Sequence, residues 1–445
     1  MDFSTDIMQQ VASLLSGEIK AWRKANPDTS SYEIENGLRK ALQKLGTVLL
    51  GEMYRAEEGP YAPTEVTCRC GGRAKYQRRR EAKTLSSLGW VGYRRAYYIC
   101  PECHQGRYPL DDRLGLRAGQ VSVALGELLA LEGIDVSFEQ AQRKVAKMLL
   151  IDVSENTIRK ETQAFGELRS EEEAGWIEES REGYDLLARR RLAEEPPERL
   201  YGSIDGVLVP VDKEWHELKC GCWYEVEGKE SSCKVGETGS LHATQLDYYC
   251  DLGDATHFHE LAWATGYKRQ ADRAREIVFV ADGAAWIWKL VREEFPGATE
   301  IVDWYHAAEY LSGVAQAACD TEEKKEDWLK RTRKQLWQGE IEQVIASCGE
   351  HEKDSEVTPW AKKAITYFTN NKERMDYKRL REEGYQIGSG TVESACKQIG
   401  TQRLKRAGAR WGAAGAQHTA KARAAWLGNQ WDSLVSRTIC AAQAA

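Results

Sequence analysis

The chain has 445 residues, of which 42% are hydrophobic and 29% are charged, and its formal net charge is −7. This length predicts about three structural units with a substantial buried core. The first residues lack the pattern of a secretory signal, and no apolar run of about 18 residues is present, so we expect a cytoplasmic protein without a membrane span.

Charge is distributed unevenly along the chain. Residues 161–200 contain twelve acidic and six basic residues, whereas residues 372–430 contain twelve basic and five acidic ones. A second basic segment, residues 73–107, has nine basic and two acidic residues. Such a segment is often only a solvated face, but both segments are also candidates for contact with phosphates.

Residues 1–58 are predicted to form an N-terminal helical region. Leu38, Leu42, Leu45 and Leu49 recur there at helical spacing. Packing in a core and packing between two copies of the chain both explain this apolar stripe.

Two close pairs of cysteines follow within residues 59–115. They are Cys68 with Cys70 and Cys100 with Cys103. Clustered cysteines in a chain without a secretory signal favour metal binding over disulfides. Four thiolates on two tight turns can bind one Zn²⁺ tetrahedrally, so we predict a zinc-ribbon-like domain. The first pair is C-x-C rather than C-x-x-C, which leaves buried cysteines without a metal as the alternative.

Residues 116–197 are predicted to contain a helix-turn-helix-like pair and a charged linker. Ser137 and Ser154 lie where helix N-caps are expected. The second helix would present three polar side chains to a DNA groove, namely Asn156, Arg159 and Lys160. An ordinary helix pair that does not contact DNA explains the spacing equally well.

Residues 198–430 read as three strands and then helix, strand, helix, strand, helix. Asp205 lies in the apolar first strand, Asp282 ends the fourth, and Asp303 belongs to the fifth. A carboxylate in an apolar strand is costly unless it is paired or binds a cation. If the first and fourth strands are adjacent, Asp205 and Asp282 repel each other and a divalent cation relieves that repulsion. A strand-end turn or a helix cap is the alternative for either residue.

A second group of metal-ligand types lies within residues 220–259. Its members are Cys220, Cys222, Cys233, Cys250, His257 and His259. Their spacing is irregular, so we expect ordinary buried thiols here, with a second zinc site as the alternative.

Several stretches of this region resemble bacterial insertion-sequence transposases of the ISKra type. They are S-I-D-G-V, V-A-D-G-A-A-W-I-W, D-W-Y-H, G-S-G-T-V-E-S-A-C-K-Q and Q-R-L-K-R-A-G-A-R-W. The resemblance covers roughly residues 60–430 and is most specific in the G-S-G-T-V-E motif. It implies an α/β ribonuclease H-like catalytic core with a helical insertion at about residues 312–384, preceded by the helical and zinc-ribbon-like DNA-binding regions.

The resemblance also implies the site residues. Asp205, Asp282 and Glu393 match the catalytic acids of DDE transposases, which hold two Mg²⁺ or Mn²⁺ ions for in-line phosphoryl transfer. His306 belongs to a D-x-x-H element and is expected either to brace Asp303 or to position a water molecule. Five basic residues after Glu393 are expected to contact DNA phosphates: Lys397, Arg403, Lys405, Arg406 and Arg410. Trp411 either stacks on a base or packs in the core.

A transposase of this type would bind double-stranded DNA, both at the element ends and at the target, and would act as a homo-oligomer associated with the nucleoid. Two other functions fit the same residues. One is a ribonuclease H-like nuclease without strand transfer, and the other is a domesticated DNA-binding protein without catalytic activity. Residues 431–445 are expected to form a C-terminal tail.

Overall fold

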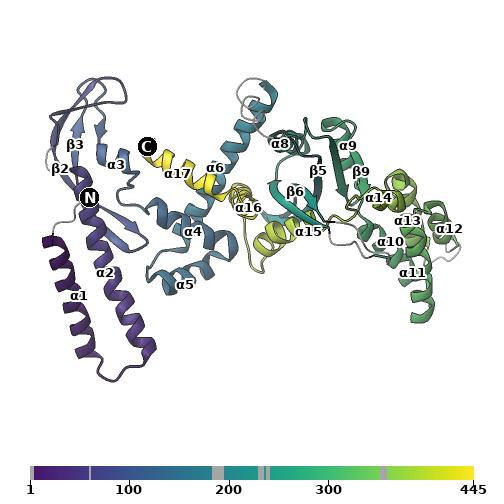
Figure 1. Cartoon of the computed structure of the whole chain (residues 1–445), viewed down its shortest axis with the longest axis horizontal. Coiled ribbons are helices and arrows are strands. Elements are labelled where there is room, and N and C mark those ends of the chain that lie inside the picture. Colours follow the sequence, from purple (N-terminus) through teal and green to yellow (C-terminus); the bar gives the residue numbers. More distant parts are fainter. Residues whose placement is uncertain are drawn as a thin grey trace. The chain divides into compact units, whose positions relative to one another are not determined.

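The computed structural model of the chain divides into two compact units, which are described separately. It describes residues 5–59, 62–182, 195–228, 235–236, 241–350 and 358–444. The first unit comprises Met1–Leu168 with Asp432–Ala445, and the second comprises Arg169–Trp431. Figure 1 labels the helices and strands of both.

The first unit begins with a helical hairpin of α1 (Thr5–Ala25) and α2 (Ser31–Glu58), as the leucine spacing predicts. Ser30 starts α2 with a capping box, because its hydroxyl accepts from the Glu33 N–H and the Glu33 carboxylate accepts from the Ser30 N–H. A Cβ at Gly37 would lie 2.4 Å from the Trp22 ring, so glycine allows the two helices to approach closely.

A four-stranded antiparallel sheet follows, in the order β1-β2-β3-β4. Its strands are β1 (Glu65–Thr67), β2 (Arg73–Ser86), β3 (Gly89–Ile99) and β4 (Gly106–Arg107). Ala74, Ala96 and Tyr98 form a small core together with Cys68 and Cys100. The two cysteine pairs therefore lie in the β1–β2 and β3–β4 turns.

Helices complete the first unit. They are α3 (Pro109–Leu114), α4 (Val123–Asp135), α5 (Phe138–Leu149), the start of α6 (Glu155–Glu182), and α17 (Trp431–Ala444). The Ser137 hydroxyl accepts from the Gln140 N–H at 3.3 Å, and the Ser154 hydroxyl accepts from the Thr157 N–H at 3.1 Å. Both predicted helix caps are confirmed. The helix α6 continues from the first unit into the second.

The second unit contains a five-stranded mixed sheet in the order β7-β6-β5-β8-β9. Its strands are β5 (Arg199–Val211), β6 (Glu214–Glu227), β7 (His242–Asp251), β8 (Glu276–Ala281) and β9 (Thr299–Val302). The first three strands are antiparallel, and β8 runs parallel to both β5 and β9. The continuous apolar run of β8 is typical of a parallel strand covered on both faces.

Two helices connect the later strands, α8 (Ala255–Lys268) after β7 and α9 (Ala285–Glu294) after β8. An aromatic cluster packs between sheet and helices, with the Trp223 ring 5.3 Å from Phe279 and 5.2 Å from Phe295. A Cβ at Gly266 would lie 2.7 Å from Trp223, so this glycine of α8 lets the helix lie close to the sheet.

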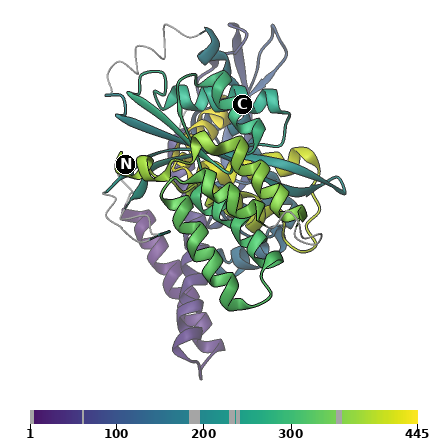
Figure 2. The ribbon, with the colours of Figure 1, turned by 90° about the vertical axis from the view of Figure 1, so that its right-hand side faces the viewer.

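A helical region separates β9 from the last part of the second unit. It contains α10 (Trp304–Ala318), α11 (Glu322–Trp337), α12 (Ile341–Gly349), α13 (Thr358–Asn371), a short 3₁₀ turn (Lys372–Arg374) and α14 (Tyr377–Glu382). In Figure 2 these green helices face the viewer and lie side by side. They are followed by α15 (Gly390–Ala395), a π-helical segment η2 (Cys396–Leu404) and α16 (Ala413–Leu427).

The protein is therefore a mixed α/β protein with two separate sheets. The strands and helices of residues 199–318 follow each other along the chain in the predicted order. Among the described residues, none of the helices combines the length and apolarity needed to cross a lipid bilayer.

Candidate metal centres

The four cysteines of the first unit converge on one point. The Sγ atoms of Cys68 and Cys103 lie 3.6 Å apart, as do those of Cys70 and Cys100, and all four lie within 4.8 Å of one another. A tetrahedral zinc ion with Zn–S bonds of about 2.3 Å holds its sulfurs about 3.8 Å apart. This group can therefore hold a metal ion such as zinc.

Backbone geometry in the two turns prepares this convergence. The Cys68 N–H donates to the Gly72 carbonyl at 2.8 Å, and Gly71 adopts a φ of +90°, which glycine tolerates without strain. In the second turn the Cys100 N–H donates to the Gln105 carbonyl at 3.1 Å. A hydrogen bond from the Cys70 N–H lowers the pKa of the Cys68 thiol to about 7. Against a hydrogen bond from Gly72, the neighbouring thiols raise the pKa of Cys70 to about 12, so the shift favours the thiolate at Cys68 alone.

The strand register of the second unit aligns three aspartates. On the parallel pair β5 and β8, Gly202 lies beside Phe279, so extending the register by three residues places Asp205 beside Asp282. On β8 and β9, Ala281 lies beside Val302, so one further residue places Asp282 beside Asp303. The strands of Asp205 and Asp282, β5 and β8, are therefore adjacent, which is the condition under which the two carboxylates were expected to repel each other. Asp303, at the end of β9, lies beside Asp282.

Local hydrogen bonds hold each aspartate in place. The Gly206 N–H donates to Asp205 Oδ1 at 2.7 Å, and the Ala284 N–H, where α9 begins, donates to Asp282 Oδ1 at 2.8 Å. The latter bond closes a turn at the end of β8, so the strand-end-turn alternative accounts for one carboxylate oxygen of Asp282. Asp205 caps no helix.

Glu393 reaches this edge through a loop attached to Asp303. The Trp304 N–H donates to the Ile387 carbonyl at 3.0 Å, and the Ser389 N–H donates to the fully buried Asp303 carboxylate. The Ser389 hydroxyl lies within hydrogen-bonding distance of Asp303 and, at 3.2 Å, of Glu393 Oε1. Asp303 and Ser389 thus position the helix α15 that carries Glu393.

The four carboxyls influence one another electrostatically. Burial raises the pKa of Asp205, and the nearby Asp282 raises it further, against the lowering effect of the Gly206 N–H. Burial and then the charge of Asp303 raise the pKa of Glu393, and Asp205 adds to this effect. Across the part of the chain that the structure describes, no lysine or arginine forms an ion pair with any of the four.

The carboxylates do not converge as the cysteines do. Within the described ranges, only the four cysteines bring three or more ligand atoms within 4.8 Å of one another. A centre with two ions about 3.5–4 Å apart needs ligands spread over a wider space than a single tetrahedral ion does. The four carboxyls lie near enough to influence one another electrostatically without forming such a compact group.

His306 supports Asp303 through its main chain. Its backbone N–H donates to Asp303 Oδ1 at 2.8 Å, which starts α10. Its ring packs edge-on against Tyr310 and Tyr367, and it counteracts the rise in the pKa of Asp205. The expected brace is thus made by the backbone, and the ring lies within electrostatic range of Asp205.

The basic residues after Glu393 fall into two groups. Lys397, Lys405 and Arg410 are exposed, and Arg406 is half-buried. Arg403 is only 2% exposed, with its guanidinium 4.8 Å from the centre of the Trp411 ring. Arg403 therefore lies in the interior, unlike the other residues expected to contact phosphates. Trp411 is also buried, which matches the expectation of a core position rather than base stacking.

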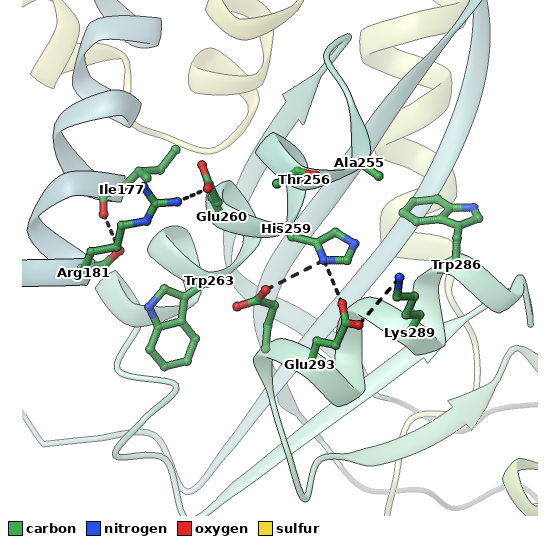
Figure 3. Close-up of a pocket in the computed structure, with 12 residues that line it drawn as sticks. Ile177, Arg181, Ala255, Thr256, His259, Glu260, Trp263, Trp286, Lys289 and Glu293 are labelled. Carbon is green, nitrogen blue, oxygen red and sulfur yellow. Dashed lines mark hydrogen bonds and ion pairs between the residues drawn. The ribbon is translucent and has the colours of Figure 1, made fainter.

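The described members of the second group of cysteines and histidines do not form a cluster of metal ligands. Cys220, Cys222 and Cys250 are buried in β6 and β7, while Cys233 lies outside the described residues. His259 instead lines a cavity of about 670 Å³ bordered by α6, α8 and α9, where its Nδ1 is 3.5 Å from Glu293 (Figure 3). Burial lowers the pKa of His259. None of the predicted catalytic acids lines this cavity.

Sequence reasoning missed the roles of Ser389 and of the buried Asp303 in holding Glu393. The serine within the G-S-G-T-V-E motif was the available signal. No protein-family model matches the sequence, and the curated proteins searched include no similar one.

Proposed function

We propose that this protein is a DDE-type DNA transposase with a ribonuclease H-like core, as its resemblance to ISKra-type transposases implies. It would cleave DNA at the ends of an insertion sequence and join those ends to target DNA. The observation that carries this proposal is the group of four carboxyls, Asp205, Asp282, Asp303 and Glu393, which no described lysine or arginine neutralises.

The donor set fits divalent cations. Carboxylate oxygens are hard ligands of the kind that Mg²⁺ and Mn²⁺ prefer. Mutual repulsion and burial raise the pKa values of Asp205 and Glu393, and a bound cation would remove that repulsion. Asp205, Asp282 and Glu393 would hold the ions, which activate the attacking oxygen and stabilise the leaving oxygen of a phosphodiester when bound.

The remaining residues of the site have positioning roles. The buried Asp303 accepts from Ser389 and from the His306 backbone, so it fixes where α15 begins and where Glu393 points. Lys397 lies one turn after Glu393 on the same helical face and is exposed. It would bind a phosphate next to the cleaved bond, and Lys405, Arg406 and Arg410 would bind phosphates further along the strand.

The first unit would recognise the DNA ends. The cysteine cluster, with a zinc ion, would stabilise the small sheet whose long strands carry most of the basic segment of residues 73–107. At the start of α6, Arg159 donates to Asn156 at 2.5 Å, and both side chains are exposed. A DNA groove would take this pair. Synapsis of two ends would require at least two copies of the chain, acting at the nucleoid.

The test uses the purified protein and DNA that flanks its own gene. With Mg²⁺ or Mn²⁺ we expect nicks at element ends and joining to a target plasmid. Asp205→Asn, Asp282→Asn and Glu393→Gln should each reduce cleavage roughly a thousandfold or more while DNA binding persists. Glu326→Gln, an exposed acid on α11, is the matched control.

Cleavage at the normal rate by Glu393→Gln would refute the site assignment. Hydrolysis without joined products would favour the nuclease alternative. DNA binding without any metal-dependent cleavage by the unmodified protein would favour the domesticated, non-catalytic alternative.

A further inference from the structure

The strand that carries Asp205 continues into a rigid hairpin. The β5–β6 ladder is unbroken from Tyr201 opposite Tyr224 to Val211 opposite Glu214. Asp212 and Lys213 form the two-residue turn with φ values of +50° and +70°, as this type of hairpin requires. The Asp212 N–H donates to the Trp411 carbonyl at 2.9 Å, and its carboxylate accepts from the Ala413 N–H at 3.3 Å. The turn is therefore fixed to the start of α16.

This rigid hairpin presents an exposed tryptophan. Trp215, opposite Pro210 in the ladder, is 63% exposed, more than any other tryptophan among the exposed hydrophobic residues that the structure describes. Its ring has the Lys405 ammonium 5.6 Å from its centre. When another flat apolar surface covers a large exposed ring on stiff strands, the burial of that ring stabilises the complex.

Basic residues lie on the same hairpin end as the ring. Lys213 and Arg410 line an open cavity of about 690 Å³ beside the hairpin turn. The Asp212 carboxylate in this cavity already caps α16. Two acids also lie at the hairpin end of β6: Glu214, and Glu217, which is 3.7 Å from Lys219. An aromatic ring beside several cations is the combination that binds single-stranded nucleic acid, with a base on the ring and phosphates on the cations.

The distance from the carboxyls sets the position of that base. Pro210 is five residues beyond Asp205 on β5, which corresponds to about 17 Å along an antiparallel strand. Because successive side chains of a strand face opposite sides and this ladder has no bulge, Trp215 and Asp205 face opposite sides of the hairpin. Stacked nucleotides in one DNA strand are about 3.4 Å apart, so a strand held at Asp205 would pass round the hairpin and reach the ring no sooner than about five nucleotides away.

We infer that Trp215 stacks on an unpaired base of the DNA strand bound at the carboxyls, while Lys405, Lys213 and Arg410 contact the neighbouring phosphates. This inference rests on the proposed function, because the DNA is the one that the proposed activity would bind. It assigns to Trp215 the stacking role that the buried Trp411 cannot have.

The test compares two DNA probes that carry the same phosphates. One is a duplex with a single-stranded oligothymidine tail, and the other has a tail of abasic units. Binding of the full-length protein is measured by fluorescence anisotropy without divalent metal. The unmodified protein should prefer the thymidine tail by roughly 5- to 150-fold, as expected for one stacked base. Trp215→Ala should lose this preference, Trp215→Phe should keep most of it, and Trp360→Ala, a tryptophan 50% exposed on α13, should not change it.

A second measurement separates the ring from the cations. Lys405→Ala should lower the slope of log affinity against log salt by about 1, and Trp215→Ala should leave that slope unchanged. If Trp215→Ala keeps the preference for the thymidine tail, the inference is wrong. If Trp215→Ala weakens both probes equally and changes the oligomeric mass, a second copy of the chain covers the hairpin, and the inference is again wrong.

The outcomes also separate this inference from the proposed function. Glu393→Gln should retain the tail preference, because binding is measured without cleavage. If the protein cleaves DNA with metal but binds the thymidine and abasic tails equally well, only the role of Trp215 is wrong. A protein that binds neither probe would overturn both proposals.

Discussion

The cysteine cluster of the first unit and the carboxyl cluster of the second are built in opposite ways. The cysteines come from two short turns, and their sulfurs already lie at the spacing of a tetrahedral metal ion. The carboxyls come from the middle of β5, the ends of β8 and β9, and a helix distant in sequence, and they are held near one another without converging. A closed centre, in which protein ligands fill every coordination position of the ion, suits a structural role, whereas a centre with a free coordination position can bind a substrate.

Neutralisation of charge adds to this difference. Elsewhere in the second unit the buried Asp251 and Glu173 both lie beside the ammonium of Lys421, which is itself 2% exposed. The carboxyls at Asp205, Asp282 and Glu393 have no such lysine among the described residues. The same unit therefore contains buried acids that a lysine neutralises and less buried acids that form no ion pair with a lysine or arginine among the described residues.

The largest expected effect concerns the closed centre. Structural zinc contributes about 10–16 kcal/mol to folding in small zinc peptides, so removing it by chelation should unfold the sheet of β1–β4. Elemental analysis should find one zinc ion per chain, and none in Cys100→Ser, while Cys440→Ser, an exposed cysteine, should keep it. An unchanged zinc content in Cys100→Ser would contradict the assignment.

The next effect tests the lysine-neutralised acids. Lys421→Met removes the cation that lies between the buried Asp251 and Glu173. Arg169 still pairs with Glu173 at 2.8 Å and His257 lies 3.2 Å from Asp251, so the free energy of unfolding should fall by about 3 kcal/mol, the lower end of the range for a broken buried pair. Adding Asp251→Asn and Glu173→Gln to that variant should recover most of the loss. Chemical denaturation of the three proteins measures this. A loss that persists in the triple variant would show that packing, and not charge, is responsible.

The same group has a pH dependence of known sign. Burial acts to raise the pKa of Asp251, but Lys421, Gln417 and His257 together hold it below its usual range. A lowered pKa in the folded state stabilises the protein above the ordinary pKa of an aspartate. That contribution should be lost as the pH falls through the lowered value. Acid unfolding of Lys421→Met compared with the unmodified protein would show whether this dependence disappears.

A smaller effect on cleavage is expected from Ser389, which holds Glu393 next to Asp303. Ser389→Ala removes the hydroxyl between Asp303 and Glu393 and should lower cleavage about 10- to 100-fold, as the loss of a residue that orients a metal ligand does. Because the residue acts by positioning, the metal concentration for half-maximal cleavage should rise, and Ser389→Thr should restore much of the activity. An unchanged metal requirement would argue against this role.

The smallest effect concerns stability without metal. Asp205→Asn removes a repelled, partly buried carboxylate, so the metal-free variant should be more stable by about 1 kcal/mol. The raised pKa of Asp205 means that its folded form binds a proton more tightly than its unfolded form. The stability it contributes should therefore be present at low pH and lost as the pH rises through that pKa. Thermal melts at several pH values, with and without Mg²⁺, check both statements.

The sequence predicts a site more completely when its residues lie close together along the chain. The cysteine pairs form in two turns of a few residues, so their spacing alone predicted a metal site. Asp205 and Asp282 were recognisable because each interrupts or ends an apolar strand. Glu393 was found only through the resemblance, because nothing near it in sequence shows that its helix reaches the strand ends.

Burial explains what the sequence did not predict. Arg403 looks like its basic neighbours in the sequence, but the π-helical segment turns it inward against Trp411. Trp215 has no neighbouring motif, and its exposure depends on how far the hairpin extends past the sheet. Ser389 acts on Asp303 across many intervening residues, and only the folded loop shows that contact.

The connection between Ile387–Ser389 and the end of β9 has a consequence for evolution and engineering. The helical region of residues 304–382 leaves and returns at two points that are hydrogen-bonded to each other. Its length can therefore change among descendants of this gene without displacing Glu393. The Tyr367 hydroxyl of α13 donates to the Asp282 carbonyl at 2.8 Å, so a graft that keeps α13 should leave the acids in place, whereas one that replaces α13 should disturb Asp282.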